Sequence, residues 1–237
     1  MSDHIEFVIR QLPNLLWGFP NNRPGGLLLS VLLSFGAIAV GLVFATGIGF
    51  AHHSRFRMVR FLVGRFVWVV RGIPLIVLLV LLFQILGTGI VFGLELSAFW
   101  TAAVTLTAYA AAYQGDIVRA GIGAVPQQLV DDARVLGAGR LTVARSVSVP
   151  YALRVMRPGL VTQAITIFKD SSVVVVLGVA DLTTTARIVL GSNITNAPFW
   201  VATYLAVGFL YWLVAFGLAQ LVRSRQGPSL APEVAIA

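Results

Sequence analysis

The sequence predicts an all-α, polytopic membrane protein with five transmembrane helices and one long polar loop between the third and the fourth. Of its 237 residues, 58% are hydrophobic and only 11% are charged, whereas charged residues make up about a quarter of a typical soluble domain. Four runs carry almost no charge, and each is long enough to cross about 30 Å of hydrocarbon. These runs are 26–54, 72–94, 96–115 and 188–222, and a fifth, 158–180, is interrupted only by Lys169 and Asp170.

The expected spans divide the chain into three regions. Residues 1–25 form an N-terminal segment on the outer side of the membrane, where a short helix with one apolar face is expected to lie at the surface. Residues 26–222 form the transmembrane domain, and residues 223–237 form a C-terminal tail. Within the domain, the spans are expected at about 27–51, 61–86, 96–115, 158–180 and 199–222.

The arginines indicate how the spans are oriented. The loops that follow spans one, three and five hold twelve arginines, whereas the other side holds three, at positions 10, 23 and 187. Because Lys and Arg accumulate in cytoplasmic loops, we expect the N-terminus outside and both the C-terminus and the loop 119–157 in the cytoplasm. Arginines at the ends of apolar runs are typical of a chain embedded in membrane lipid, and they argue against nucleic acid as a partner.

The polar loop 119–157 is predicted to form two short helices with a break at Gly137 and Gly139. Pro126 suits the first turn of a helix, and Leu129, Ala133 and Leu136 then recur at helical spacing. Glycines just beyond such a face can adopt the left-handed conformation that ends a helix. A helical hairpin in the longest soluble loop of a membrane protein favours docking to a soluble partner.

Three charged residues lie near the middle of the bilayer. At about 1.5 Å of rise per residue, Arg71 lies roughly 15 Å along span two, and Lys169 and Asp170 lie roughly 18–20 Å along span four. A charge at this depth costs at least about 2.5–3.5 kcal/mol, so it should face protein or a watery cavity. Pro74, three residues after Arg71, loosens the helix there and can free backbone groups to line such a cavity.

These charges allow two interpretations. They can neutralise one another and lock spans two and four together. Alternatively, they can form a polar substrate site, in which Arg71 and Lys169 attract a carboxylate and Asp170 attracts an ammonium group. An amino acid carries both groups, so the second interpretation predicts an amino acid as the substrate.

Enzymatic and metal chemistry is not expected in this chain. It has no cysteine, and its three histidines, at 4, 52 and 53, have no other ligands nearby in the sequence. A phosphate-binding loop requires GxxxxGK followed by Ser or Thr. The sole lysine, Lys169, lies within a membrane span, and GAGR at 137–140 has the wrong spacing. Neither a metal nor a cofactor is therefore expected here, and any ATP hydrolysis must be carried out by another subunit.

Four segments resemble the permease subunit of ABC importers for polar amino acids, of the histidine, glutamine, glutamate and arginine type. The similarity covers about residues 26–222. Its segments are VRGIPLIVLL at 70–79, AYQGDIVRAGIGAVP at 112–126, LVDDARVLGAGRLTVARSVSVPYALRVMRP at 129–158 and FKDSSVVVVLGVADL at 168–182. The third segment is similar to the cytoplasmic EAA loop of that family. Asp131, Asp132 and Ala133 stand at the Glu-Ala-Ala positions, and Gly137 stands at that of the glycine.

The resemblance implies a membrane subunit of an ATP-driven, binding-protein-dependent importer in a bacterial inner membrane. It implies that the loop 119–157 is a coupling loop that docks into a cytoplasmic ABC ATPase, which would bind ATP and Mg²⁺. The docking residues would be Asp131, Asp132, Ala133, Leu136 and Gly137. A second permease subunit, identical or similar, and a periplasmic or lipid-anchored amino acid binding protein would complete the assembly.

Two other functions remain open at this point. An ion-coupled secondary amino acid carrier is the first, although such carriers are usually longer and contain internal repeats, which this sequence does not show. The second is a membrane assembly subunit without a substrate path, which is favoured if Arg71 and Asp170 have only structural roles. Copurification with a stoichiometric ATPase would distinguish the importer from the carrier.

Overall fold

The computed structural model of the chain describes residues 2–19, 24–91, 93 and 95–223. Within these residues every regular element is a helix and no strand is formed, as predicted. Most of the expected C-terminal tail, residues 224–237, lies outside the described part, as do positions 20–23, 92 and 94. The main helices are α1 Ser2–Trp17, α2 Gly26–His52, α3 Arg57–Gly72, α4 Leu75–Leu86, α5 Ala98–Gly123, α6 Gln127–Val135, α7 Arg140–Val143, α8 Val149–Asp170, α9 Leu182–Gly191 and α10 Trp200–Arg223.

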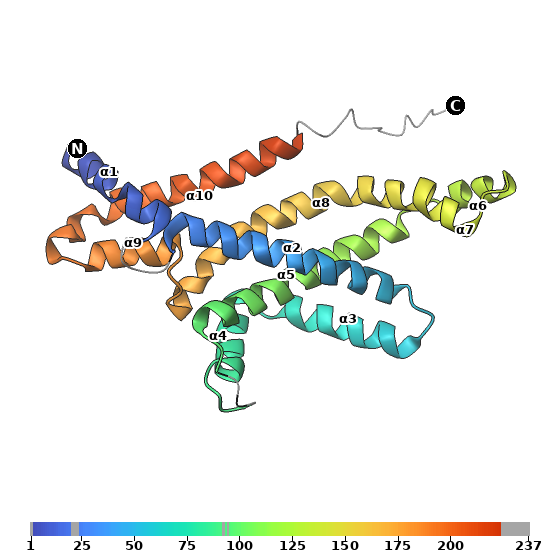
Figure 1. The fold of residues 1–237 in the computed structure, drawn as a ribbon, viewed down its shortest axis with the longest axis horizontal. Helices are drawn as coiled ribbons and strands as arrows, with labels where there is room; N and C mark the ends of the chain where they lie inside the picture. Colours follow the sequence, from blue (N-terminus) through green and yellow to red (C-terminus); the bar gives the residue numbers. More distant parts are fainter. Residues whose placement is uncertain (1, 20–23, 92, 94, 224–237) are drawn as a thin grey trace.

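The long helices α2, α5, α8 and α10 run lengthwise through the molecule (Figure 1). Helices α1 and α9 lie at one end, and the hairpin of α6 and α7 lies at the other. The turn between α2 and α3 points toward the hairpin end. The arginine-rich segments after the first and third expected spans therefore lie toward the same end of the molecule.

Helices α2 and α5 pack closely because α2 presents a small residue at every fourth position. Ala37, Gly41, Ala45 and Gly49 are all buried along one stripe of α2. A Cβ atom at Gly41 would lie 2.7 Å from the Cβ of Ala110 on α5, so nothing larger than hydrogen fits there. Helices in lipid gain stability from such close contacts, since lipid chains are as apolar as the side chains themselves. The α2–α5 pair forms the centre of the fold.

Three segments of the described chain are long and apolar enough to cross a membrane: Gly26–His52, Arg140–Leu177 and Ile194–Gln220. The pair α3 and α4 qualifies as a fourth only if it counts as one bent span. Helix α5, which contains the expected third span, is not among them. Its polar Thr101, Thr105 and Gln114 are buried against other helices, so protein rather than lipid surrounds them.

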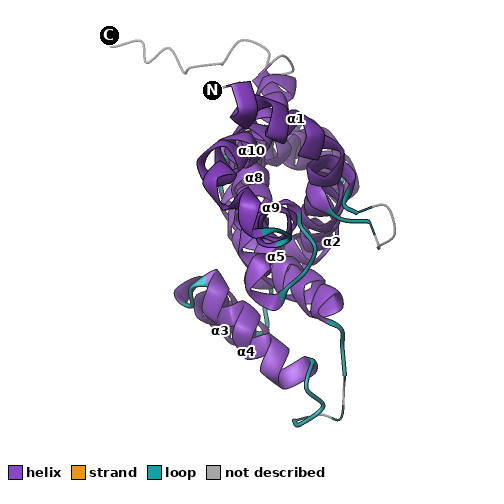
Figure 2. Cartoon of the chain, turned by 90° about the vertical axis from the view of Figure 1, so that its left-hand side faces the viewer, coloured by secondary structure: helices purple, strands orange, loops and turns teal. Residues whose placement is uncertain are grey.

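The expected second span is two helices that meet at 112° rather than one straight helix. Ile73 has an extended backbone (φ −100°, ψ 130°) because Pro74 disfavours a helical conformation in the residue before it. Figure 2 shows α3 and α4 standing apart from the bundle of the other helices. The 12 residues of α4 extend about 18 Å, which is shorter than the roughly 30 Å of the hydrocarbon core.

The polar loop 119–157 is more helical than expected. Helix α5 continues to Gly123, and α6 forms the first predicted short helix. The expected second short helix is not separate, because the helical segment that begins at Arg140 continues through a π-helical turn and past Pro158 into the fourth expected span. Arginine, which is frequent in this loop, is a good helix former, so the end of an apolar run does not mark the end of a helix.

Asp181 joins α9 to α10 at the end of the molecule opposite the hairpin. Its side chain is fully buried and caps α9 by accepting hydrogen bonds from the backbone N–H groups of Thr183 (3.2 Å) and Thr184 (2.8 Å). The hydroxyl of Tyr211 on α10 donates a third hydrogen bond, at 3.2 Å. Burial raises the pKa of the Asp181 carboxyl, although these hydrogen bonds act in the opposite direction.

We expect Asp181→Ala to lower the free energy of unfolding by about 2–3 kcal/mol, because it removes a helix cap and leaves the Tyr211 hydroxyl without its acceptor. Urea unfolding of the purified protein in detergent micelles measures this loss. Asn193→Ala is the matched control, since Asn193 caps a short 3₁₀ helix at an exposed position. Its loss should stay below about 1 kcal/mol. Equal losses in the two variants would contradict a structural role for the buried carboxylate.

Candidate functional site

One stripe of α5 carries polar side chains into the interior of the molecule. Tyr109, Tyr113 and Asp116 are spaced at i, i+4 and i+7, so they share one face of the helix. The rings of Tyr109 and Tyr113 lie 4.6 Å apart between centroids. This stripe faces the end of α3, where Arg71 is the last charged residue before the bend.

Asp116 is shared by two arginines from different helices. Its Oδ2 atom accepts a hydrogen bond from Nη1 of Arg71 on α3. Its Oδ1 atom accepts from Nε of Arg119 (2.8 Å) and lies 2.7 Å from Nη2 of the same residue. The Arg71 guanidinium also lies over the ring of Tyr113, 5.0 Å from its centroid. Within the described residues, Arg71–Asp116 is the only ion pair that joins two helices.

A cavity of about 520 Å³ opens beside this ion cluster, between α3, α5 and the end of α2. Its lining includes Trp68, both arginines of the cluster, Asp116, Tyr113 and His52. The Nε2 atom of His52 is buried and has no hydrogen-bond partner within the described part of the chain. The cavity therefore offers two guanidinium groups and one carboxylate to a small polar ligand, and His52 forms part of its wall.

Lys169 and Asp170 lie at the C-terminal end of α8, where the helix passes into a 3₁₀ segment. Lys169 is exposed and Asp170 is partly buried. Their side chains form no ion pair with each other or with Arg71 within the described residues. Neither residue is part of the lining of the cavity beside the ion cluster. Arg71 is neutralised by Asp116 instead of by a charge on span four.

Asp116 and Arg119 were not predicted as members of this site. Asp116 falls one residue beyond the expected end of span three at Gly115, so it was not counted as a charge within the membrane. The spacing Asp-x-x-Arg on a helix permits an ion pair on one face, and this was the available signal. The identity of the partner on α3 depends on how α3 folds back onto α5.

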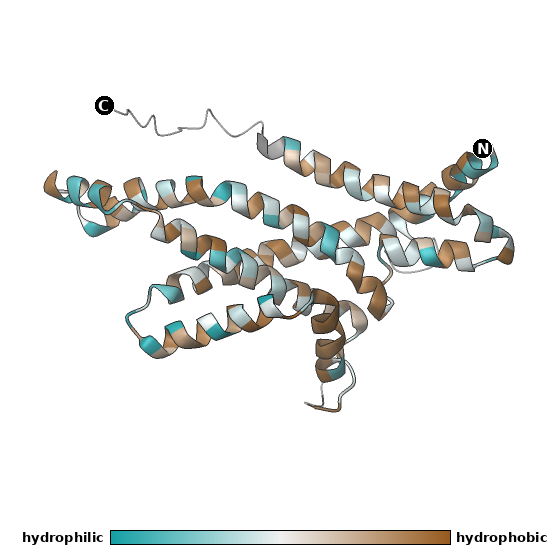
Figure 3. Cartoon of the chain, turned by 180° about the vertical axis from the view of Figure 1, so that it is seen from behind, coloured by the Kyte–Doolittle hydropathy of each residue, from teal (hydrophilic) through white to brown (hydrophobic). Residues whose placement is uncertain are grey.

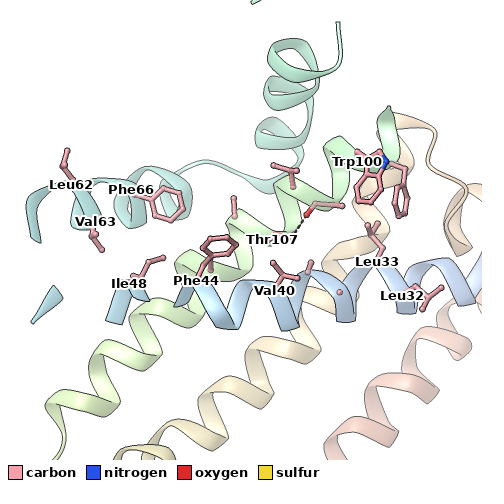
Figure 4. A pocket seen from close by; sticks show the side chains of 17 residues that line it. Leu32, Leu33, Val40, Phe44, Ile48, Leu62, Val63, Phe66, Trp100 and Thr107 are labelled. Carbon is pink, nitrogen blue, oxygen red and sulfur yellow. Dashed lines mark hydrogen bonds between the residues drawn. The ribbon is translucent and has the colours of Figure 1, made fainter. Parts of the chain in front are cut away.

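A second cavity, of about 860 Å³, lies between α2, α3 and α5 but is lined almost entirely by hydrocarbon. Figure 4 shows Phe44 and Phe66 facing one another across it, with Val40 farther along α2. The hydroxyl of Thr107 is already bonded to the Ala103 carbonyl oxygen (2.7 Å). A charged solute would lose its hydration there without gaining a partner, so this groove is not a site for a polar substrate.

The hairpin of α6 and α7 exposes the predicted docking residues. No residue of α6 is buried, and the side chains of Val135 and Leu136 are 87% and 88% exposed. Asp131 is held within α6 by Gln127 (3.0 Å) and Arg134 (3.5 Å). The hairpin mixes hydrophilic and hydrophobic residues, whereas α4 is almost entirely hydrophobic (Figure 3). Large apolar side chains exposed in a polar hairpin are typical of a surface that another protein covers.

Gly137 ends α6 with the predicted left-handed conformation, at φ +85°. The N–H of Gly137 donates to the carbonyl of Arg134 (2.9 Å), and the N–H of Ala138 donates to that of Ala133 (3.0 Å). This pair of hydrogen bonds is the Schellman motif, which satisfies the last carbonyl groups of a helix. The break predicted at Gly137 is therefore confirmed, and it fixes the angle between α6 and the helix that follows.

Long packed helices, a partly exposed ion cluster beside a cavity and an exposed hairpin at one end are the features expected of a membrane component of a transport machine. Residues 37–225 match the family described as "Binding-protein-dependent transport system inner membrane component". The chain belongs to this family, and the resemblance inferred from its motifs is confirmed.

Several relatives are described as amino acid permeases. The chain is 28% identical over 200 residues to the inner membrane amino-acid ABC transporter permease protein YhdY of Escherichia coli (strain K12), with 83% of this chain and 53% of YhdY covered. It is 29% identical over 220 residues to the glutamate/aspartate import permease protein GltK of Escherichia coli O6:H1, with 91% and 93% covered. The chain thus spans about half the length of YhdY and almost all of GltK.

Two solved structures share the fold. A crystal structure of an amino acid ABC transporter with histidines superposes with a TM-score of 0.75 at 25% identity, covering 95% of each chain. An inward-facing structure of the MetNI methionine ABC transporter superposes with a TM-score of 0.62 at 20% identity, covering 96% of this chain and all of the other.

Proposed function

We propose that this chain is the membrane-spanning permease subunit of an ATP-driven importer of polar amino acids. The observation that carries the proposal is the cavity beside Arg71 and Asp116. It offers a cation for the carboxylate of an amino acid and an anion for its ammonium group, inside a fold of this transport family. Relatives described as permeases for glutamate/aspartate and for arginine support the substrate class. The chain itself hydrolyses no ATP. A partner ABC ATPase binds ATP and Mg²⁺.

The proposed topology has five crossings in a bacterial inner membrane. The bent pair α3 and α4 forms the second crossing, and α5 forms the third. The N-terminal segment 1–25 lies outside, the permease domain covers 26–222, and the tail 223–237 is cytoplasmic. The arginine excess of the hairpin and of the α2–α3 turn supports this orientation, because both lie toward the same end of the molecule (Figure 1).

The hairpin at the cytoplasmic end is the proposed docking site for the ATPase. The residues proposed to contact a cleft of that partner are Asp131, Asp132, Ala133, Leu136 and Gly137. An amphipathic helix with exposed apolar side chains is suited to a groove on another protein. The Schellman turn at Gly137 makes α6 a rigid lever, and three residues, 124–126, separate α6 from α5. Movement of the docked hairpin is thereby transmitted to α5, the helix that carries Asp116.

The transport cycle follows from this layout. A periplasmic or lipid-anchored binding protein delivers the amino acid against the outer links 87–95 and 181–198. ATP-driven closure of two ATPase subunits moves the hairpins of two permease subunits, which are either copies of this chain or a similar pair. The amino acid then passes Asp170 and Lys169 on α8 and Arg71 on α3, which line the path through the membrane.

We expect Asp170→Asn and Arg71→Ala each to lower amino acid uptake at least tenfold, because each removes a charged hydrogen-bond partner worth about 1.5–3 kcal/mol. The measurement is ATP-dependent uptake of L-glutamate, L-glutamine and L-arginine into liposomes that contain the permease, its ATPase and the binding protein. Glu6→Gln is the control, since Glu6 belongs to an exposed ion pair with Arg10 on α1.

Copurification of the ATPase in constant ratio verifies that each variant assembles. Normal uptake by both assembled variants would assign Arg71 and Asp170 structural roles only. Uptake driven by an ion gradient in the absence of ATP would contradict the importer and favour a secondary carrier.

A further inference from the structure

We propose that the cavity between α3 and α5 is the site that binds the two α-substituents of the amino acid, with Asp116 as the partner of the ammonium group and Arg71 as the partner of the carboxylate, while Arg119 stays paired with Asp116. This inference rests on the proposed function and extends it, because the structure places a carboxylate beside Arg71 that span four does not supply. Asp116 thus becomes the residue that distinguishes an amino acid from a simple carboxylic acid.

The ion cluster matches the charge pattern of an amino acid. Both oxygens of Asp116 are occupied, Oδ2 by Arg71 and Oδ1 by Arg119. An amino acid brings one positive and one negative group, so it can enter without leaving an unpaired charge behind. The ligand carboxylate pairs with Arg71, which releases Oδ2 of Asp116. The ligand ammonium group then donates to Oδ2, while Arg119 stays paired with Oδ1. The side chains of Arg71 and Asp116 are 43% and 28% exposed, so a ligand can reach them, and the exchange keeps every charge of the cluster paired.

The cavity has the size and the second set of contacts that a ligand site needs. Its volume of about 520 Å³ lies within the range of roughly 300–1,000 Å³ that is typical of small-molecule sites. The Nε2 atom of His52 is buried at its wall without a hydrogen-bond partner in the described structure. The ring of Tyr113 holds the Arg71 guanidinium from one side, so Arg71 is already oriented before a ligand arrives.

The other candidate places fit the amino acid headgroup less well. The groove in Figure 4 lacks charged side chains altogether. Lys169 and Asp170 are adjacent in one helix and would point about 100° apart, so they do not face a common ligand. Neither residue lines the cavity, whereas the cavity itself holds both charges at hydrogen-bonding distance from one another.

The decisive comparison is between an amino acid and its deaminated counterpart. The pairs are L-glutamate with glutarate, L-glutamine with glutaramate, and L-arginine with 5-guanidinopentanoate. Equilibrium dialysis measures binding to the purified permease–ATPase complex without the binding protein, so that only the membrane site selects the ligand. The pair used is the one whose amino acid the wild-type complex imports fastest.

We expect Asp116→Asn to weaken binding of the amino acid at least tenfold and to leave binding of the deaminated acid unchanged or stronger, because both arginines are freed. Arg71→Gln should weaken binding of both compounds. Unchanged preference for the amino acid in Asp116→Asn would overturn this site while leaving the proposed function intact. Failure of the wild-type complex to import any of the three amino acids would overturn the proposed function and this site together.

A second measurement does not depend on removing a charge. The chain contains no cysteine, so a single introduced cysteine reports one position. Gly64 lines the cavity, and a Cβ atom there meets only His52, at 3.7 Å. We expect the imported amino acid to slow maleimide labelling of Gly64→Cys at least fivefold. Labelling of Gly208→Cys on α10, where a Cβ atom meets nothing within 4 Å, should not change. Equal labelling of Gly64→Cys with and without the amino acid would contradict the site.

Discussion

Gly41→Leu is expected to lower the free energy of unfolding by about 3 kcal/mol or more and to reduce the yield of assembled protein. A side chain at this position meets the Cβ of Ala110 at 2.7 Å and the backbone nitrogen of Ala111 at 3.2 Å. A backbone atom cannot move aside as a flexible side chain can, so α2 and α5 must separate along their whole contact. Overpacking of this kind costs about 1–3 kcal/mol and sometimes more. Denaturant unfolding in detergent, followed by circular dichroism, measures the change.

Gly47→Leu provides a control on the same helix. A Cβ atom at Gly47 meets nothing within 4 Å, because this position faces away from α5. Replacing glycine there should leave stability unchanged or raise it slightly, since leucine favours the helix by up to about 1 kcal/mol relative to glycine. Similar losses at positions 41 and 47 would show that the α2–α5 contact is not the centre of the fold.

Gly137→Val is expected to separate ATP hydrolysis from transport. Gly137 has φ +85°, a conformation that costs an L-residue about 1–2 kcal/mol and a β-branched residue more. The Schellman turn must then open, and the angle between α6 and the next helix changes. We expect ATP-dependent uptake to fall at least fivefold, while the ATPase activity of the complex stays within about twofold of the wild type. The variant changes the hairpin of the permease and leaves the nucleotide sites of the partner ATPase unaltered. Parallel assays of uptake and phosphate release test this.

Gly139→Val serves as the comparison within the same turn. Gly139 has φ −68° and ψ 161°, which valine adopts readily, and a Cβ atom there has open space around it. This variant should retain coupled transport. Full coupling in Gly137→Val, or equal uncoupling in the two variants, would contradict the role proposed for the left-handed turn.

The fold class and the hairpin could be predicted because they depend on local patterns. Long apolar runs require helices in lipid, where every backbone polar group must be satisfied within the segment. The end of α6 at Gly137 follows from glycine's access to positive φ. Pro74 indicated a loosened helix after Arg71, but one continuous span was expected there, and the bend of 112° was not predicted. A proline marks where a helix is interrupted, but surrounding contacts decide how far the chain turns.

The ion cluster could be predicted only in part. Arg71 was identified as a costly charge at depth, and a partner was expected for it. That partner is Asp116 of α5 rather than a charge of span four, because the α3–α4 bend brings the end of α3 against α5. The interpretation in which Arg71 is neutralised by span four fails for the same reason. Asp116 was overlooked because hydropathy ended span three at Gly115, whereas α5 continues to Gly123.

The sequence by itself determined that the chain is helical, that it belongs in a membrane, and that its exposed hairpin turns at Gly137. Each of these features depends on hydropathy, charge or backbone freedom within a few neighbouring residues. Only the tertiary structure decided which helix becomes the interior one and which carboxylate meets Arg71. Polar α5 is stable in the interior because the small residues of α2 let the two helices approach, and an ion pair between separate helices exists only once packing has set their distance.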